Sequence, residues 1–188
     1  MPIVVENLGW MFFNIALAFI GVGFAYLFLG TKKGLLKLLF FILWLLFLPN
    51  TIYLLTDLQY LPEQFMKVNS ADKFILVFEY LSLLILGIFT FMIGIKPLEI
   101  VLKKEFKKDK TAIVLSNIAI NFTISFGVVL GKVERVHSWY VFTDPKGVIE
   151  SSIRVLSDQG LVILIFSFGV IINIVFFYFK KFRVFKFR

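Results

Sequence analysis

The chain has 188 residues, of which 60% are hydrophobic and 17% are charged, and its formal net charge at pH 7 is +8. A soluble domain is closer to half apolar and one quarter charged, so lipid must cover much of this apolar surface, which excludes a purely soluble protein. The lysines lie beside the apolar stretches, which makes membrane lipids the expected partners and argues against nucleic acid, and the absence of cysteine excludes disulfides and thiolate metal sites.

Five apolar stretches are each long enough to cross a bilayer as an α-helix, which takes about 20 residues. They are continuously apolar, whereas a membrane β-strand alternates over a shorter stretch. The sequence therefore predicts an all-α, polytopic membrane helix bundle with five transmembrane helices in a single domain over residues 1–188. The expected spans are about 8–30, 35–56, 74–95, 111–131 and 161–179.

The distribution of Lys and Arg around these spans predicts their orientation. Counted alternately, the flanking segments carry 14 of these residues on one side and 6 on the other, and the first seven residues carry none. The richer side is expected to be cytoplasmic. The N-terminus is then outside, the C-terminus is cytoplasmic, and the first apolar stretch, which lacks a basic leader, is a permanent span.

The second span ends in a proline-broken polar face. Pro49 removes a backbone donor, which is tolerated at membrane depth only where protein or water satisfies the backbone. Asn50, Tyr53 and Asp57 are spaced three and four residues apart, so they share one helix face. This face is expected to point to protein or to a wet cavity, because lipid disfavours it. A binding site and a hydrogen-bonded seam between helices both fit the pattern.

The fourth span brings a positive charge to the same side of the membrane. It runs in the same direction as the second span, so Arg135 is expected to emerge on the side of Asp57, and the two can form an ion pair. The alternative is that Arg135 lies among lipid headgroups, with Trp139 and Tyr140 in the interfacial aromatic belt.

Two further titratable residues are candidates for the same outer cluster. Glu79 in the third span is unlikely to face lipid, and it either joins Asp57 or is a hydrogen-bonded structural acid. His137, the only histidine, suits a proton acceptor. A metal ion is not expected, because zinc needs three or four ligands and no paired-histidine spacing is present. No cofactor is expected.

The long fourth loop contains a helix-start signal at Asp144 and Pro145. The apolar residues that follow repeat near helical spacing, which predicts a short amphipathic helix over Pro145–Ser157. This helix lies either on the outer membrane interface or against the bundle. Four asparagines inside the spans are expected to form hydrogen-bonded pairs between helices, and the alternative is a polar permeation path; they are Asn14, Asn117, Asn121 and Asn173.

Two stretches resemble an uncharacterised bacterial membrane family, domain-of-unknown-function family 1361. One is similar to its Phe-x-Pro-Asn-x-x-Tyr-x-x-Thr-Asp pattern, at Phe47, Pro49, Asn50, Tyr53, Thr56 and Asp57. The other is similar to a Gly-Arg-x-x-Arg-x-Asn-Ser-Trp-Asp pattern, at Gly131, Arg135, Ser138 and Trp139, but departs from it at Lys132, His137 and Tyr140. The resemblance implies a bacterial, multi-span protein of the cytoplasmic membrane and supplies no activity.

Three functions stay open, and the first is preferred. It is binding or transport of a small molecule or lipid headgroup at the extracytoplasmic face. Because five spans are few for a carrier, a homo-oligomer or a partner subunit is expected. The second is an intramembrane enzyme that uses Asp57 or Glu79 as general acid or base. The third is a structural or accessory subunit whose charges join helices. The expected ligand-binding residues are Asn50, Tyr53, Asp57, Glu79, Arg135, His137 and Trp139.

Overall fold

The computed structural model describes residues 2–107 and 109–181. Every regular element within them is a helix, and five helical segments are long and apolar enough to cross a membrane. These findings confirm the predicted all-α membrane class and the five spans. The chain divides into two compact units, Met1–Ile95 and Lys96–Arg188, with the boundary inside one long helix.

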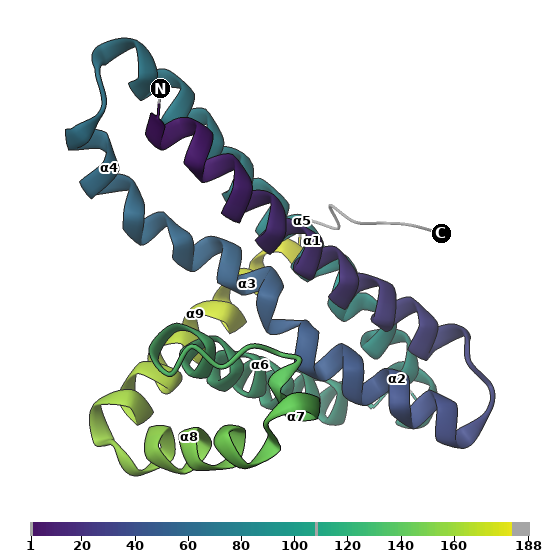
Figure 1. Ribbon diagram of the computed structural model, residues 1–188. Helices are drawn as coiled ribbons and strands as arrows, with labels where there is room; N and C mark the ends of the chain where they lie inside the picture. The colour runs from purple at the N-terminus through teal and green to yellow at the C-terminus, as the bar shows by residue number, and fades with distance from the viewer. Residues whose placement is uncertain (1, 108, 182–188) are drawn as a thin grey trace. The chain divides into compact units, whose positions relative to one another are not determined.

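The first unit is built from three helical segments that pack on one another. Its elements are α1 (Pro2–Gly30), α2 (Gly34–Phe47), α3 (Pro49–Thr56), the 3-10 helix η1 (Asp57–Tyr60), α4 (Leu61–Lys67) and the first part of α5 (Ser70–Glu105). The path from α2 to α4 runs antiparallel to α1, as Figure 1 shows. Two contacts mark this direction: Phe28 near the end of α1 packs on Phe41 of α2, and Asn14 nearer its start bonds Asp57. The first part of α5 runs parallel to α1.

Neighbouring side chains donate hydrogen bonds to backbone carbonyls at the helix break before Pro49. The helix α2 ends at Phe47, and Pro49 occupies the start of α3. The side-chain amide of Asn50 donates to the Phe47 carbonyl at 2.9 Å, and the Thr51 hydroxyl donates to the Leu48 carbonyl at 2.7 Å. Polar side chains beside the proline thus replace bonds that a continuous helix would make.

Two glycines allow the helices of the first unit to approach closely around this break. A Cβ atom on Gly21 would lie 2.9 Å from the Phe47 carbonyl oxygen, and one on Gly87 would lie 3.0 Å from the Thr51 carbonyl oxygen. A Cβ atom at Gly21 would require a shift of the backbone, and one at Gly87 would make a contact tighter than most that real Cβ atoms make. Glycine therefore allows α1 to come close to the end of α2 and α5 to come close to α3.

The path from α2 to α4 is longer than the predicted second span, which ends at residue 56. It continues through η1 and α4 to Lys67, because Leu58 and Leu61 still pack against a buried apolar cluster. Asp57 therefore lies ten residues inside the path, on the order of 15 Å from its end at the helical rise.

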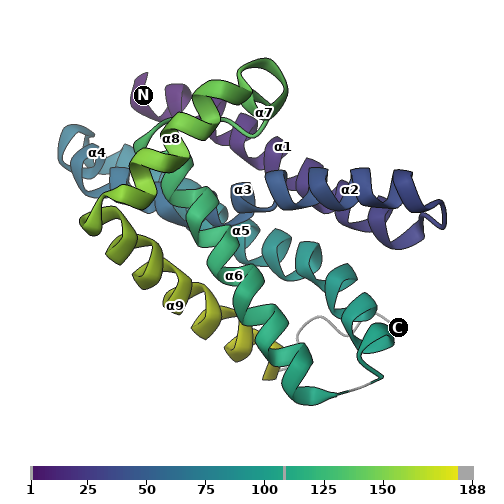
Figure 2. The same cartoon turned by 90° about the horizontal axis from the view of Figure 1, so that it is seen from below.

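The second unit contains an antiparallel helix pair. After the last part of α5 come α6 (Lys110–Val133), α7 (Tyr140–Thr143), α8 (Pro145–Ser157) and α9 (Gln159–Lys181). Figure 2 shows α6 and α9 side by side, joined where Asn121 donates to the Asn173 side chain at 2.9 Å and Ser125 donates to the Ile165 carbonyl. The Asn121–Asn173 bond confirms the predicted pairing for these two asparagines. Asn14 instead bonds Asp57, and the prediction is wrong for Asn117, which donates to the Ile113 carbonyl of its own helix. Lys180 of α9 forms an ion pair with Glu99 of α5.

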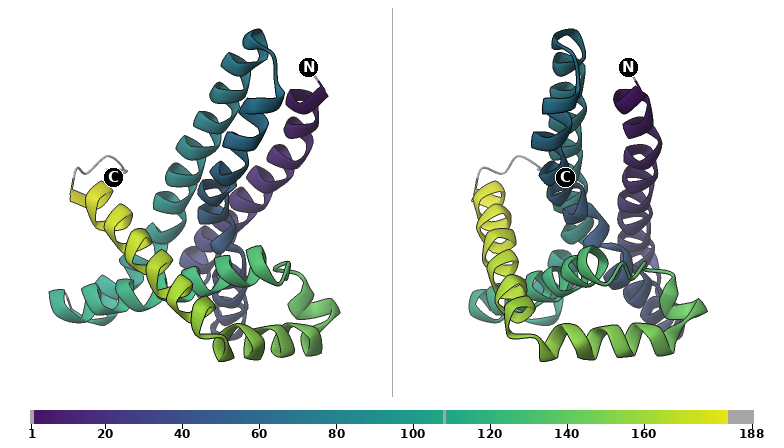
Figure 3. Two further views of the ribbon diagram at one scale, coloured as in Figure 1. Left: turned by 90° about the vertical axis from the view of Figure 1, so that its left-hand side faces the viewer. Right: turned by 60° about the vertical axis from the view of Figure 1, so that its left-hand side comes forward.

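The amphipathic helix has the predicted bounds, and Asp144 caps it by accepting a bond from the Gly147 backbone at 3.0 Å. In Figure 3 this helix (light green) leads directly into α9 (yellow). Its Val155 side chain is fully buried in a cluster with residues of α6. Its opposite side exposes Ile149, Ile153 and Leu156, so contact of this face with the membrane interface stays a prediction.

Candidate functional site

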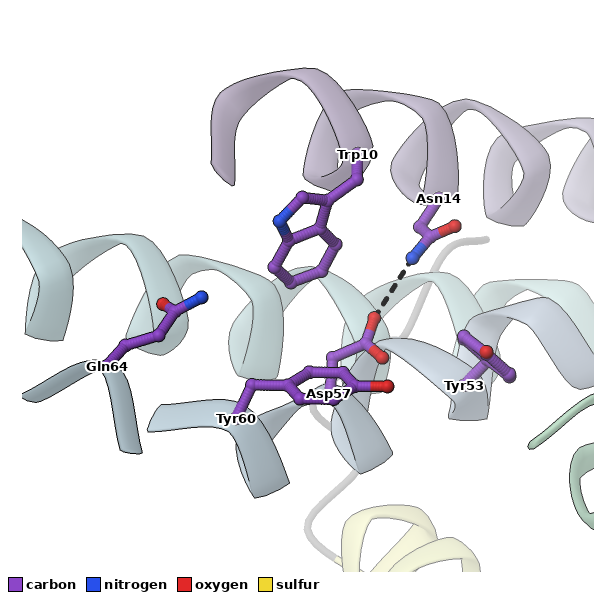
Figure 4. A pocket seen from close by; sticks show the side chains of 6 residues that line it. All are labelled: Trp10, Asn14, Tyr53, Asp57, Tyr60 and Gln64. Atoms are coloured by element: carbon purple, nitrogen blue, oxygen red, sulfur yellow. Dashed lines mark hydrogen bonds between the residues drawn. The ribbon is translucent and has the colours of Figure 1, made fainter. Parts of the chain in front are cut away.

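A cavity of about 320 Å³ lies in the first unit between α1 and the path from α3 to α4. Figure 4 shows the six side chains that line it, which are Trp10, Asn14, Tyr53, Asp57, Tyr60 and Gln64. Tyr53 and Asp57 are among the residues expected from the sequence. The other four were not assigned to a site, and two of them come from the first helix.

Asp57 is the charged residue in this wall. It begins η1, directly after α3, and its side chain is buried, with 1% of the residue exposed. The side-chain amide of Asn14 donates to its Oδ2 atom at 3.0 Å, as the dashed line in Figure 4 shows. A carboxylate is costly to bury unless hydrogen bonds or an opposite charge stabilise it. Asn14 supplies one such bond across two helices.

Aromatic rings form much of the remaining wall. The rings of Trp10 and Tyr60 meet edge to face, with their centroids 6.2 Å apart and their planes at 73°. The indole N–H of Trp10 donates to the Asn7 side-chain oxygen at 3.1 Å, which fixes the orientation of its ring. Tyr53 adds a third ring. The cavity therefore combines a buried carboxylate, amide groups and three aromatic side chains.

A hydrogen-bonded amide network lies next to the cavity. Asn7 and Gln64 exchange two bonds, at 2.8 and 2.9 Å, and the Tyr80 hydroxyl donates to the same Gln64 oxygen at 3.0 Å. Asn7 also donates to Oε2 of Glu79 at 3.2 Å. Glu79 is 8% exposed and enters the cluster through Asn7. This network joins α1, α4 and α5 at the end of the unit that holds the cavity.

Asn50 has a different environment from the cavity residues, although it shares their helical spacing. Its side chain bonds the Phe47 carbonyl at the helix break. The described residues that line the cavity do not include it. Its hydrogen-bonding capacity is thus used at least partly for the backbone beside Pro49.

The remaining predicted residues lie in the second unit, in the segment after α6. Arg135 has a φ of 54°, a left-handed conformation that is uncommon for a residue with a side chain. His137 stacks on Trp139, with ring centroids 4.5 Å apart and planes at 4°, and meets Tyr140 edge on. The predicted ion pair between Asp57 and Arg135 joins residues of different units and stays a prediction.

Glu134, beside Arg135, has a partner that the sequence did not reveal. The Arg154 guanidinium of α8 donates to its Oε2 atom through Nη2 at 2.5 Å and through Nε at 3.1 Å. The same Nη2 atom donates to the Ser151 hydroxyl at 2.6 Å. The hydrogen bond from Arg154 lowers the pKa of the Glu134 carboxyl below its ordinary value. This pair connects the end of α6 to α8.

No group of three or more His, Asp or Glu side chains in the described part of the chain is arranged to hold a metal ion. The His137 ring is engaged with Trp139 and Tyr140 in the second unit, whereas Glu79 belongs to the amide network of the first. The chemistry available in the cavity is therefore that of a carboxylate, amides, phenols and an indole.

Five apolar helical segments with buried polar residues between them define a multi-pass α-helical membrane protein. The model of the family described as "Protein of unknown function (DUF1361)" matches residues 13–175, and the chain belongs to this family. The match includes both stretches on which the resemblance rests. No curated protein and no solved structure matches the chain.

Proposed function

We propose that the protein binds or transports a small polar molecule or a lipid headgroup through the cavity between α1 and the α3–α4 path. One observation carries this proposal: a cavity of about 320 Å³ lies beside a buried carboxylate within membrane-spanning helices. Ligand sites are commonly cavities of this size with a few convergent polar groups. Ionisable residues inside a membrane segment mark binding or transport sites more often than inert structure.

The side and surroundings of the cavity follow from the charge pattern. The cavity lies toward the N-terminal end of α1, and the flanking Lys and Arg counts support an extracytoplasmic position for that end, in a membrane that we propose to be the cell membrane of a bacterium. Membrane lipids would contact the exposed apolar side chains of the spans. A second copy or a partner subunit would complete a transport path, because five spans are few for a carrier.

A structural role is favoured for part of the cluster by its hydrogen bonds. Asn7, Gln64 and Glu79 join three helices, and their bonds hold the helices together without a ligand. Asp57 differs, because it borders open space together with aromatic side chains. Binding is therefore assigned to the Asp57 side of the cluster, and the amide network positions the walls.

Labelling of single cysteines tests whether the cavity opens to water on the outside. The chain contains no cysteine, so one introduced thiol gives no background. We expect Tyr53→Cys in intact cells to react with a membrane-impermeant maleimide. Ile85→Cys is the matched control. Ile85 lies at a depth similar to that of Tyr53, because Gly87, two residues further along α5, packs beside Thr51 and Leu55. Its side chain is 59% exposed on an apolar helix, where lipid would cover it.

The expected result is labelling of Tyr53→Cys at least about tenfold faster than of Ile85→Cys, since lipid shields the control from a charged reagent. Equal and negligible labelling of both, in protein shown to be folded and inserted, would contradict a water-accessible site. In that case the polar cluster would be a sealed seam between helices.

A further inference from the structure

We infer that the cavity recognises an organic ammonium group, held by the Asp57 carboxylate and the aromatic side chains of Trp10, Tyr53 and Tyr60. This inference rests on the proposed function and names the chemical class of its ligand. The ammonium group can belong to a lipid headgroup, such as ethanolamine or choline, or to a free small amine. The shared chemistry is a cationic nitrogen with attached carbon atoms.

The charge of the wall selects a cation over an anion. Of the six lining side chains, Asp57 is acidic and none is Lys, Arg or His. A cation bound in the cavity would bring an opposite charge to the Asp57 carboxylate, which is 1% exposed. The Asn14 amide contributes a dipole and no net charge. A phosphate or carboxylate ligand would meet repulsion from Asp57 and no cation on this wall.

The aromatic residues select an organic cation over a metal ion. A cation is attracted to the face of Trp or Tyr within about 6 Å of the ring centre, and this attraction grows when water is removed. Trp10 and Tyr60 meet edge to face at 73° with their centroids 6.2 Å apart, and both line the cavity together with Tyr53. Hard metal ions require several close oxygen ligands instead, and a cavity of about 320 Å³ is far larger than a dehydrated ion.

Neighbouring bonds hold this wall in place before a ligand arrives. The indole N–H of Trp10 is bound to Asn7, and Asn7 is bound in turn to Gln64 and Glu79. The ring of Trp10 therefore has a fixed orientation, and its indole N–H already has a hydrogen-bond acceptor. A preformed aromatic wall lowers the ordering cost of binding.

The test uses the full chain in nanodiscs of phosphatidylglycerol, a lipid without an amine. Choline and ethanolamine are titrated while tryptophan fluorescence is recorded, because Trp10 lines the cavity, and Trp10→Phe identifies its share of the signal. The uncharged isostere of choline, 3,3-dimethylbutan-1-ol, reports binding by shape alone. We expect saturable binding of at least one ammonium compound and binding of the isostere weaker by about tenfold or more, since it lacks the charge.

Variants separate the carboxylate from the rings. Asp57→Asn is expected to weaken ammonium binding by at least about tenfold through loss of the charged partner. Glu63→Gln, which also replaces an acid by its amide but on an exposed residue of α4, should leave binding within about twofold. If Asp57→Asn fails to fold, Tyr60 still gives a test, because it is 42% exposed. Tyr60→Phe keeps the ring and should retain binding, whereas Tyr60→Leu should weaken it about 2- to 30-fold.

The outcomes separate the two proposals and the two sources. The ammonium assignment is overturned if Tyr53→Cys is labelled but neither ammonium compound binds, or if the uncharged isostere binds equally well. Either result leaves the proposed binding function intact. An unlabelled cavity overturns both. Competition of phosphatidylethanolamine in the nanodisc with free choline or ethanolamine would identify a lipid headgroup as the ligand, and binding of free amine unaffected by that lipid would identify a soluble amine.

Discussion

Asn14 and Asp57 illustrate how a polar pair can serve both stability and binding. Asn14→Leu would remove the donor to Asp57 Oδ2 and leave a buried carboxylate oxygen without that bond. We expect the free energy of unfolding to fall by about 1–3 kcal/mol. The measurement is unfolding by a denaturing detergent in mixed micelles, followed by circular dichroism.

Asn117→Leu is the control for that change. Asn117 is also a buried asparagine in a span, but its side chain donates to the Ile113 carbonyl of its own helix at 2.7 Å. Its Oδ1 atom has no hydrogen-bond partner among the described residues. Replacement by an apolar residue should therefore be nearly neutral. Equal effects of the two substitutions would show that the Asn14–Asp57 bond contributes no special stability.

The residues of the cavity were only partly predictable from the sequence. Tyr53 and Asp57 were found because helical spacing places them on one face. On the first span, Asn7, Trp10 and Asn14 are spaced three and four apart, and this stripe was an available signal of the same kind. Gln64 was hidden because the polar residues after Thr56 resembled a loop. Asn50 bonds the carbonyl three residues before it, and helical spacing alone does not distinguish that local role from lining the cavity.

At the scale of elements, the helix α8 combines an accurate sequence signal with a contact that the sequence did not show. The Asp144 cap and the apolar spacing fixed its bounds, because both are local properties. Its attachment to α6 depends on Glu134 and Arg154, which are 20 residues apart. Several acidic and basic residues lie in this region, so charge alone does not identify the pair.

This attachment should depend on pH in a defined direction. The pKa of Glu134 is lowered from 4.5 by its hydrogen bond from Arg154. A carboxyl group with a lowered pKa in the folded state stabilises the fold above its ordinary pKa and loses that contribution as pH falls through the lowered value. We expect the difference in Tm between the wild-type protein and Glu134→Gln to be constant above about pH 5 and to shrink below about pH 4.5.

The melting temperatures are measured in detergent from pH 6 to pH 2.5. Glu150→Gln is the matched control, because Glu150 lies 3.9 Å from Lys146 in an exposed pair within α8. Exposed pairs of this kind contribute little, so its Tm difference should be small at every pH. A Glu134→Gln difference that persists unchanged at pH 2.5 would mean that ionisation of Glu134 has no part in holding α8 to α6.

At the scale of the whole molecule, hydropathy predicted the class and the number of spans, because each span needs about 20 apolar residues whatever its neighbours are. The ends of the spans were less predictable. The helix α5 extends past Ile95 through Pro97 to Glu105, and its 36 residues correspond to about 54 Å at the helical rise. Lysines and a proline near its end resemble a loop in sequence, yet a helix can continue beyond the hydrocarbon core into water.

The orientation of the chain decides whether the proposed site faces outward, and two exposed lysines test it. Lys146 of the fourth loop and Lys104 at the end of α5 lie on opposite sides in the predicted arrangement, and each variant has a single thiol because the chain has no cysteine. We expect an impermeant maleimide to label Lys146→Cys in intact cells and Lys104→Cys only after the membrane is opened. The reverse pattern would place the cavity on the cytoplasmic side, where the proposed ligand would have to be a cytoplasmic amine or an inner-leaflet headgroup. Labelling of both variants in intact cells would contradict the predicted alternation of the spans between them.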